Sequence, residues 1–433
     1  MPKVAFITLG CKVNQYETNA MSQEFIEKGY EVVEHHKKAD IYVINTCTVT
    51  NMSDRKSRQM LRRVKELNPN SIVIACGCYV QVAKDEVAKI EDIDLILGNN
   101  EKKDIVEHLE QYQKDKKRQL EIEDLMQQRE FVEFGDVTYT EKTRAVVKIQ
   151  DGCDRFCSYC IIPYARGRVR SRKPEGIISE ITKISQEGIK EVVITGIHVA
   201  SYGKDFKENY GLIDLLEDLN KIEGIERIRL SSIEPLILDE QFINRLSKLE
   251  KICHNFHLSL QSGCDETLKR MNRRYNTEQF KTVVNLIRNT YKDAILTADV
   301  IVGFPGETEE EFEKTYKFLE DVKFYKTHIF KYSPRKGTKA AVMENQIDGN
   351  IKEQRSKKLI ELSNNFEKEY NESYIGKTVE VLWEEEKEGI YKGHTQNYLL
   401  AYYKPEKGDM NLENKITKAN CLSAESDHII VEI

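Results

Sequence analysis

The sequence lacks any apolar run that approaches the ~18 residues of a membrane-spanning helix. Its first residues contain neither a charged leader nor a cleavage site, so we expect them to form a core strand rather than a signal peptide. The two glycine patterns of phosphate-binding loops, Gly-x-Gly-x-x-Gly and Gly-x4-Gly-Lys-Ser/Thr, are also missing. These absences predict a cytoplasmic protein with no membrane partner and no common phosphate loop.

Ten cysteines occur in the 433 residues. Without an export signal, this number favours a reducing compartment and metal ligation over disulfides. The chain is long enough for about two to four domains. Its net charge of −6 says little about nucleic acid, because binding depends on local patches and the segments 62–63, 166–173 and 270–274 are basic.

Three of the cysteines, Cys153, Cys157 and Cys160, lie in the stretch Gly-Cys-Asp-Arg-Phe-Cys-Ser-Tyr-Cys. This spacing lets one tight loop direct three thiolates at a single cubic cluster. Such a cluster takes four ligands, so three local thiolates leave one iron open, as catalytic metal sites do. A zinc knuckle and a redox dithiol of Cys157 and Cys160 are the alternatives. Zinc is disfavoured because no second Cys or His pair follows at short spacing.

The first part of the chain alternates apolar runs with amphipathic segments. Buried strands are predicted at 3–9, 41–46, 72–76 and 94–97, with helices near 15–28, 53–67, 84–90 and 101–117. This order predicts an α/β domain with a doubly wound parallel sheet over residues 1–115.

Cysteines follow three of these predicted strands: Cys11, Cys47, and the pair Cys76 and Cys78. The carboxyl ends of parallel strands share one edge, where ligands of such folds bind, so we expect these distant thiols to converge. Buried apolar cysteine is the alternative. The Gly- or Thr-flanked turns around these residues favour a second three-thiolate cluster.

A second alternating series follows a charged segment at 112–142. Six strands are predicted near 144–150, 191–196, 227–232, 257–261, 296–302 and 327–332, with helices between them. They predict a partial α/β barrel over 142–372 whose top face holds the cysteines after its first strand. A polar helix at 350–372 leads to short alternating segments, which predict a small antiparallel β-barrel over 373–433.

Arginine occupies every second position in a stretch just after the cysteine loop: Arg166, Arg168, Arg170 and Arg172. In an extended segment the four guanidinium groups would share one face. Arginine is suited to bidentate contact with phosphate, so this face is a candidate RNA-binding surface. The alternative is a solvated edge segment whose charges deter strand pairing.

The cysteine loop follows a strand and has an aromatic residue, Tyr159, before its third cysteine. It resembles the loop of the radical S-adenosylmethionine (SAM) enzymes. That resemblance implies that the open iron chelates the amino and carboxylate groups of SAM. It further implies that one electron splits the sulfonium to give a 5′-deoxyadenosyl radical.

The same resemblance implies SAM contacts at the ends of the barrel strands. The candidates are Gly196, Ser232, Glu234, Gln261 and Gly303, together with Tyr159. Each is weak alone, since Gly and Ser are ordinary in turns at strand ends. The Gly-Gly-Glu common in that family is replaced here by Thr195-Gly196-Ile197, which leaves the carboxylate partner of the SAM amino group unassigned.

The chain as a whole resembles the methylthiotransferases within the radical SAM enzymes. The matching segments are Leu-Gly-Cys-Lys-Val-Asn-Gln-Tyr-Glu-Thr (9–18), Asn-Thr-Cys-Thr-Val-Thr (45–50), Gly-Cys-Tyr-Val-Gln (77–81) and Gly-Phe-Pro-Gly-Glu-Thr (303–308). The resemblance implies a second [4Fe-4S] cluster held by Cys11, Cys47 and Cys78, with Cys76 as an extra thiol. The tail resembles the TRAM module, an RNA-binding barrel.

The segment 10–17 resembles the branch that acts on N6-threonylcarbamoyladenosine at position 37 of tRNA. The isopentenyladenosine branch typically has Gln-Met-Asn there. The resemblance implies that one SAM methylates a sulfur at the second cluster, and that another gives the radical that removes hydrogen from adenine C2. That C–H bond has no acidic proton, so cofactor radical chemistry is needed to open it.

The implied partners are tRNA, an electron donor such as flavodoxin or ferredoxin, and an unidentified sulfur donor. Three alternatives stay open. In the first, the substrate would be isopentenyladenosine of tRNA; in the second, it would be an aspartate of a ribosomal protein. In the third, the chain would be a non-catalytic iron–sulfur protein that binds RNA.

Overall fold

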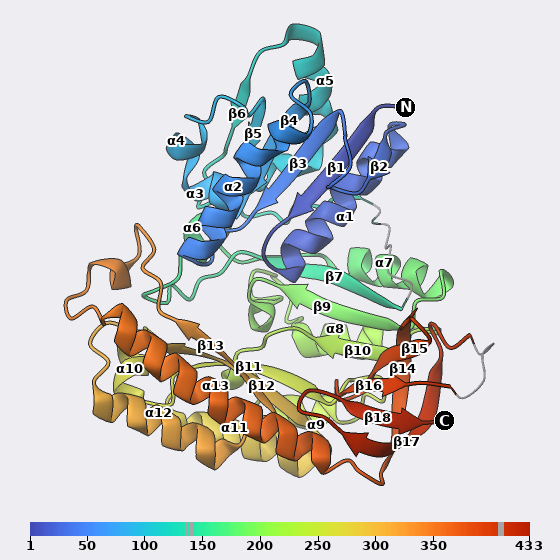
Figure 1. Ribbon diagram of the computed structural model, residues 1–433, viewed down its shortest axis with the longest axis vertical. Coiled ribbons are helices and arrows are strands. Elements are labelled where there is room, and N and C mark those ends of the chain that lie inside the picture. Colours follow the sequence, from blue (N-terminus) through green and yellow to red (C-terminus); the bar gives the residue numbers. More distant parts are fainter. Residues whose placement is uncertain (136, 138–142, 406–410) are drawn as a thin grey trace.

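A six-stranded parallel sheet forms the first part of the chain, at the top of Figure 1. The computed structural model describes residues 1–135, 137, 143–405 and 411–433. The strands are β1 (Lys3–Thr8), β2 (Glu31–Val33), β3 (Ile41–Thr46), β4 (Ile72–Gly77), β5 (Leu95–Leu97) and β6 (Gln119–Glu121). Their spatial order is β2-β1-β3-β4-β5-β6, so the order reverses between β1 and β3. In such sheets the reversal marks the ligand-binding crevice.

Helices cover both faces of this sheet, which confirms the doubly wound prediction. On one face α1 (Lys12–Glu27) and α5 (Ile105–Asp115) bury Met21, Phe25 and Leu109. On the other, α2 (Asn51–Leu67), α3 (Cys78–Val82) and α4 (Lys84–Val87) bury Leu61 and Tyr79. The short strands β2 and β6 were not predicted. Each has three residues, most of them exposed, and so shows no alternation of apolar and polar residues.

Six parallel strands form the partial barrel in the middle of the molecule, as predicted. They are β7 (Arg144–Asp151), β9 (Glu191–Gly196), β10 (Arg227–Leu230), β11 (Asn255–Gln261), β12 (Ile295–Val302) and β13 (Lys326–Lys331). Two isolated bridges, Ile228 to Ile252 and Ile233 to Leu258, join the halves of the barrel. A short antiparallel strand, β8 (Arg170–Ser171), pairs with the end of β7.

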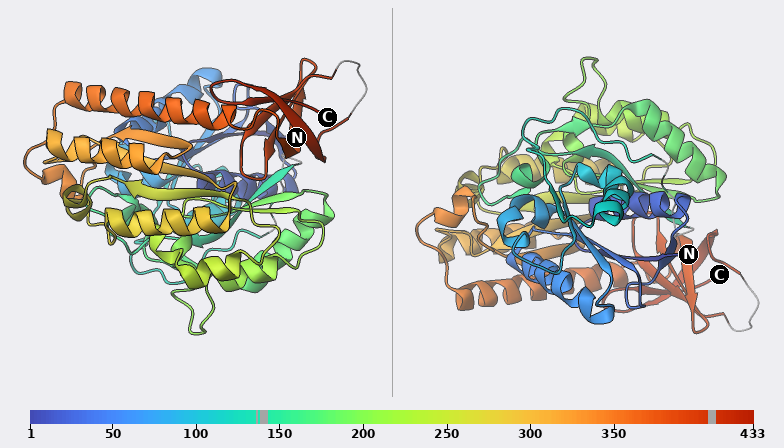
Figure 2. Two further views of the ribbon diagram at one scale, coloured as in Figure 1. Left: turned by 90° about the horizontal axis from the view of Figure 1, so that it is seen from below. Right: turned by 90° about the horizontal axis from the view of Figure 1, so that it is seen from above.

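Helices lie on the outer side of these strands, as Figure 2 shows from below. They are α7 (Pro174–Gln186), α8 (Leu212–Leu219), α9 (Glu240–Leu246), α10 (Asp265–Arg270), α11 (Thr277–Thr290), α12 (Glu309–Val322) and α13 (Gly349–Glu372). A short helix, α6 (Ile162–Arg166), follows the cysteine loop. Single 3₁₀ turns are η1 (Glu101–Asp104), η2 (Val199–Ser201), η3 (Pro235–Ile237) and η4 (Lys339–Val342). In the described part of the chain, no helix combines the length and apolar character needed to span a bilayer.

The end of the chain forms a closed five-stranded barrel around Trp383. Its strands are β14 (Thr378–Lys387), β15 (Ile390–Thr395), β16 (Leu400–Tyr403), β17 (Ile416–Ala424) and β18 (Ile429–Glu432). The barrel is not wholly antiparallel as predicted, because β16 and β18 close it as a parallel pair. It packs on the beginnings of the central strands, where Arg227 donates to the backbone oxygens of His394 and Glu380 at 3.0 and 3.1 Å.

Candidate active site

Cys153, Cys157 and Cys160, the loop thiols, lie on a turn directly after β7. Gly152 has φ +70°, and a Cβ there would overlap the backbone of residues 167 and 168. The backbone N–H of Cys153 donates to the oxygen of Gly167 at 3.0 Å, and that of Cys160 to Cys157 at 3.0 Å. Glycine at position 152 therefore allows the loop to fold back tightly on the chain that follows it.

The segment after α10 fixes the other side of this loop. The backbone N–H of Ser158 donates to the oxygen of Met271 at 3.0 Å, and its hydroxyl donates to Arg270 at 2.8 Å. The side chain of Asn272 donates to the backbone oxygen of Phe156 at 3.0 Å. These bonds hold the loop by its backbone and leave the cysteine side chains available.

Hydrogen-bond donors face two of the loop thiols. Arg273 Nη1 lies 3.2 Å from Cys157 Sγ, and the backbone N–H of Arg155 lies 3.5 Å from Cys153 Sγ. Burial raises the pKa of Cys153 to about 11 and that of Cys160 to about 12, so thiolates here need added positive charge. Iron supplies that charge, and an all-thiol donor set fits an iron–sulfur cluster.

Cys11, Cys47 and Cys78, the sheet thiols, meet at the carboxyl ends of β1, β3 and β4. A Cβ on Gly10 would lie 2.8 Å from Cys47 Sγ, and one on Gly77 would lie 2.5 Å from the oxygen of Thr46. The two glycines have φ of +106° and +99°. These close approaches bring the loops that hold Cys11 and Cys78 against Cys47, at the reversal of strand order.

The sheet thiols interact electrostatically. Burial raises the pKa of Cys11 and Cys47, and in each case Cys78 adds to the increase. Arg166 opposes it for Cys11, and its Nε donates to Cys78 Sγ at 3.1 Å. The predicted convergence is therefore present, with one buried cation beside it. Within the described ranges, no three His, Cys, Asp or Glu side chains are grouped closely enough to hold a single ion; a four-iron cluster takes its thiolates at separate irons.

Cys76 has a different environment from Cys78. It is fully buried in the core beneath α1 and α5, and its Sγ lies 3.7 Å from the oxygen of Ile44. Burial raises its pKa to about 12. This thiol packs as an apolar side chain.

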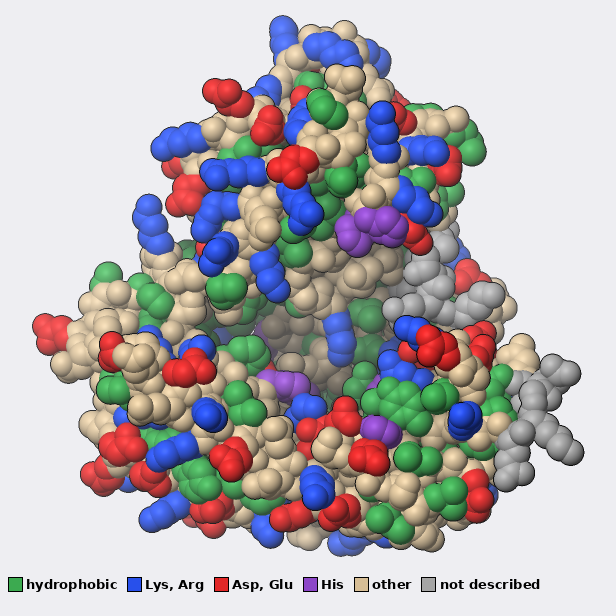
Figure 3. All heavy atoms as spheres, viewed as in Figure 1, with side chains coloured by type: hydrophobic (Ala, Val, Ile, Leu, Met, Phe, Trp, Pro, Cys, Tyr) green, Lys and Arg blue, Asp and Glu red, His purple; other side chains and the backbone are tan. Residues whose placement is uncertain are grey.

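One cavity of about 850 Å³ extends from the loop thiols to Cys11 of the sheet thiols. Cys11 and all three loop thiols line it. Its walls are alternate residues of the barrel strands, such as Asn255, His257, Ser259 and Gln261 of β11, because every second side chain of a strand points inward. In Figure 3 the molecule is hollowed between the first sheet above and the two barrels below. A molecule in this cavity can therefore contact the loop thiols and Cys11, whereas Cys47 and Cys78 are buried and are not part of its lining.

Four of the six predicted SAM contacts line this cavity: Tyr159, Gly196, Ser232 and Gln261. The other two, Glu234 and Gly303, are not part of its lining. Glu234 lies behind the wall, paired with Arg155 and 3.3 Å from His198 Nε2. Burial raises the pKa of Glu234, but His198 and Arg155 hold it down to about 2.

Gly303 also lies outside the cavity lining, since the side chain of Lys352 covers the position where its Cβ would be. Its backbone N–H donates to Glu307 Oε1 at 2.9 Å. It forms a turn with φ +70°, and turn geometry accounts for the glycine.

The predicted RNA-binding face of arginines is wrong for three of its four members. Arg166, Arg170 and Arg172 are buried, with exposed fractions of 0%, 1% and 4%. The segment is not a continuous extended strand, because Arg166 ends helix α6 and only 170–171 are paired. Arg168 alone keeps an exposed side chain, 3.2 Å from Asp154.

One carboxylate of the first domain, Glu17, and two of the barrel, Asp151 and Glu180, explain this burial. Arg166 pairs with Glu17 and lies 3.2 Å from Asp151, while Arg172 pairs with Glu180. Lys102 and Lys148 add bonds of 2.6 and 2.7 Å to Glu17; these cations hold the pKa of Glu17 well below its usual range although burial raises it. Buried charges persist only when paired, and this set joins the first sheet to the barrel.

Several polar residues of the cavity were not identified from the sequence. They are Lys12, Arg229, Asn255, His257, Asp299 and Tyr398. The alternation within β10 to β12 carried a signal, since Arg229, His257 and Asp299 are polar residues that alternate with apolar ones in these strands. No sequence pattern connects them with Lys12 or Tyr398, which belong to the other two parts of the chain.

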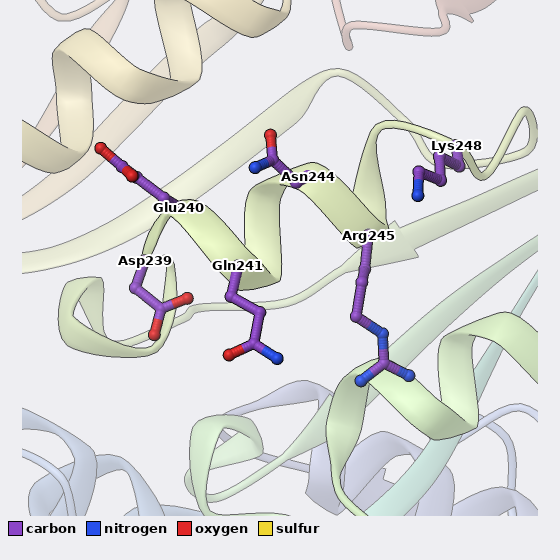
Figure 4. A pocket seen from close by; sticks show the side chains of 6 residues that line it. All are labelled: Asp239, Glu240, Gln241, Asn244, Arg245 and Lys248. Atoms are coloured by element: carbon purple, nitrogen blue, oxygen red, sulfur yellow. The ribbon is translucent and has the colours of Figure 1, made fainter.

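A second hollow, of about 700 Å³, lies beside α9 (Figure 4). Six polar residues of 239–248 line it, and Arg245 is paired with Asp214 and Glu217. No cysteine lines it, and the partners of Arg245 both lie on α8.

Comparison with protein families finds two matches. Residues 147–319 match the radical SAM superfamily, and residues 3–98 match the uncharacterized protein family UPF0004. The first covers the loop thiols and the barrel except for the start of β7 and all of β13, and the second covers the sheet thiols.

Solved structures of low sequence identity share the fold. The radical SAM methyltransferase TsrM from Kitasatospora setae, with cobalamin and a [4Fe-4S] cluster bound, has a TM-score of 0.57 at 15% identity, over 79% of this chain and 77% of that one. The cobalamin-dependent SAM radical enzyme OxsB, with aqua-cobalamin and SAM bound, has a TM-score of 0.51 over 85% of this chain and 56% of that one. These similarities concern the fold alone.

Curated relatives match the chain over nearly its whole length. A Bacillus subtilis protein named threonylcarbamoyladenosine tRNA methylthiotransferase MtaB is 42% identical over 98% of this chain and 94% of its own. The protein of that name from Aquifex aeolicus is 43% identical over 92% and 95%. A tRNA-2-methylthio-N(6)-dimethylallyladenosine synthase of Clostridium botulinum is 35% identical over 98% and 96%. The chain belongs to the radical SAM methylthiotransferase family.

Proposed function

We propose that this protein converts N6-threonylcarbamoyladenosine at position 37 of tRNA to its 2-methylthio derivative. The relatives from Bacillus subtilis and Aquifex aeolicus carry the name of that activity. The observation that supports the proposal most directly is the single cavity lined by Cys11 and by all three loop thiols. A reaction that forms a radical at one cluster and delivers sulfur from another requires both to face one substrate.

The loop thiols and the sheet thiols would each hold a [4Fe-4S] cluster. With SAM bound, such a cluster supplies the electron and the open iron for radical formation at an unactivated C–H bond. The chain's own groups have supporting roles. Arg273 beside Cys157 and Arg166 beside Cys78 donate hydrogen bonds to sulfur, which lowers the charge that the thiolates present to the cavity.

Ser232, Gln261 and Tyr159 are proposed to position SAM beside the loop thiols, since all three line the same cavity. Tyr159 is held by its packing against Phe304, with ring centroids 6.4 Å apart. The inward residues of β11 and β12 then remain for the adenosine. The walls enclose it on several sides, which keeps water and other hydrogen donors from a radical.

The C-terminal barrel is proposed to bind the tRNA body, and the reaction to take place in the cytoplasm. A flavodoxin or ferredoxin is the proposed electron donor. Of the arginines after the cysteine loop, Arg168 alone remains exposed for RNA contact.

Nucleoside mass spectrometry tests the proposal. The gene is expressed in a host without methylthiotransferases of its own, and digested tRNA is compared with and without it. We expect 2-methylthio-N6-threonylcarbamoyladenosine to appear. If the methylthio group appears on isopentenyladenosine instead, the reaction type is as proposed but the substrate is the one for which the Clostridium botulinum relative is named.

Two further outcomes separate the remaining alternatives. No modified nucleoside, but a methylthio group on a ribosomal-protein aspartate, would contradict the tRNA substrate. No deoxyadenosine from reduced, cluster-loaded protein and SAM would contradict an enzymatic role and leave an iron–sulfur protein that binds RNA.

A further inference from the structure

One lysine in the cavity has no ionic partner among the residues that the structure describes. Lys12 begins α1 and lines the cavity. Basic residues near it are matched, because Arg144 pairs with Glu191 and Glu384 at 2.7 Å each, and Arg229 lies 2.8 Å from Glu191. Within the described ranges, the Lys12 ammonium has neither a hydrogen bond nor an ion pair. This group of three cations and two carboxylates therefore has an excess positive charge, at Lys12.

Lys12 is exposed, so water can solvate its ammonium; the buried sign of a missing acceptor is Arg229. It is 2% exposed and lines the cavity. Its Nε and Nη2 donate to Glu191 at 2.8 and 3.2 Å, but its Nη1 has no partner in the described part of the chain. A buried donor without an acceptor destabilises a fold by about 1–3 kcal/mol, so such atoms usually meet a ligand or water.

The third element of this corner is Tyr398, from the C-terminal barrel. Its ring lies 4.3 Å from the Arg229 guanidinium carbon and 5.2 Å from that of Arg144, and it also lines the cavity. Residues of the first sheet, the central barrel and the C-terminal barrel thus meet at one place. The amino end of the 16-residue helix α1 adds partial positive charge there.

We propose that Lys12, Arg229 and Tyr398 form a carboxylate-binding subsite, and that its occupant is the carboxylate at the end of the threonylcarbamoyl group. This assignment rests on the proposed function. An isopentenyl group ends in two methyl groups and offers nothing to an unpaired ammonium. A threonylcarbamoyl group ends in a carboxylate, which both Lys12 and Arg229 Nη1 can bind, since charge-assisted hydrogen bonds are the strong ones.

Binding of one tRNA in two forms tests the subsite. The cluster-loaded protein is titrated with tRNA that bears threonylcarbamoyladenosine and with the same tRNA bearing unmodified adenosine. Lys12→Gln keeps most of the side-chain length and removes the charge. We expect it to weaken binding of the first tRNA about tenfold and leave the second unchanged, because a hydrogen bond to a charged group contributes about that much.

Lys12→Arg retains the charge and should keep the preference. Lys28→Gln is the matched control, since Lys28 follows the last residue of the same helix and lies outside the cavity lining. Iron content and SAM cleavage without tRNA verify that each variant is folded and loaded. If Lys12→Gln discriminates between the two tRNAs as the wild type does, the subsite is wrong.

The methionine carboxylate of SAM is the other source of the same chemistry. A raised KM for SAM in Lys12→Gln, with tRNA preference intact, would overturn the assignment to the substrate. Failure of the proposed function is seen separately, because the wild type would then yield no 2-methylthio-N6-threonylcarbamoyladenosine at all.

Discussion

The loop thiols and the sheet thiols are brought together in different ways, and the cavity is lined by all three of the first set and by Cys11 of the second. Cys153, Cys157 and Cys160 belong to a single turn, and short-range spacing alone brings them together. Cys11, Cys47 and Cys78 come from three strand ends and meet only because the sheet has its particular strand order. The first set therefore depends on local geometry, and the second depends on the global fold.

The barrel contacts both sets of thiols, whereas the contacts that anchor the loop thiols come from the barrel alone. Arg166 follows the loop thiols on helix α6, yet it donates to Cys78 of the sheet set at 3.1 Å. The loop thiols are anchored instead by residues 270–273 of the barrel. Changes in the first sheet should therefore affect one set of thiols, whereas changes in the barrel can affect both.

Removing one thiol from each set gives the largest effects. Cys157→Ala should abolish deoxyadenosine formation, because two loop thiols cannot hold a SAM-binding cluster. Cys47→Ala should leave deoxyadenosine formation largely intact and end methylthio product. Reduced protein is incubated with SAM and tRNA, and deoxyadenosine and the methylthio nucleoside are then quantified by chromatography. Deoxyadenosine formation by Cys157→Ala, or methylthio product from Cys47→Ala, would contradict the division of roles.

Arg166 tests the link between the sets. Arg166→Leu removes a buried cation from Glu17 and Asp151 and a donor from Cys78. We expect a loss of about 3 kcal/mol in unfolding free energy, the low end for a broken buried ion pair, because Lys102 and Lys148 still pair with Glu17 and Lys148 with Asp151. Denaturant unfolding measures it.

Arg168→Leu is the matched control for this change. Arg168 is two residues away and exposed, and its pair with Asp154 is worth about 0–1 kcal/mol. Equal losses in the two variants would mean that the buried network does not distinguish them. Iron content should fall at the sheet thiols in Arg166→Leu and stay normal in Arg168→Leu.

A substitution at Gly77 should lower the free energy of unfolding by less than Arg166→Leu does, and should affect only the sheet thiols. Gly77→Ala places a methyl group 2.5 Å from the oxygen of Thr46, in a residue with φ +99°. We expect a loss of about 1–3 kcal/mol and less iron at the sheet thiols, with SAM cleavage retained. Gly29→Ala shares the positive φ of +84° but meets no atom within 4 Å. If both variants lose the same stability, strain alone explains the effect and the close approach to Thr46 is unimportant.

Sequence reasoning succeeded where one rule decided the outcome. Strand ends follow from apolar periodicity, so the convergence of Cys11, Cys47 and Cys78 could be predicted. The alternating arginines failed because their spacing does not reveal their partners. Glu17 comes from the first domain, and Glu180 lies on α7, the helix that follows the stretch. The corner of Lys12, Arg229 and Tyr398 was missed for the same reason, since its members come from three parts of the fold.

Substitution of Cys76 should have the smallest effect of these changes. Cys76 is only two residues from Cys78 in sequence, but its side chain lies in the apolar core. Its Sγ faces the core under α1 and α5, whereas Cys78 Sγ faces Arg166. Cys76→Ala should reduce stability by about 1 kcal/mol through a small cavity and leave the iron content unchanged. Cys78→Ala should instead remove iron at modest change in stability of the metal-free protein. Iron analysis and thermal unfolding compare the two variants. Loss of iron in Cys76→Ala would mean that Cys76, and not Cys78, is the cluster ligand.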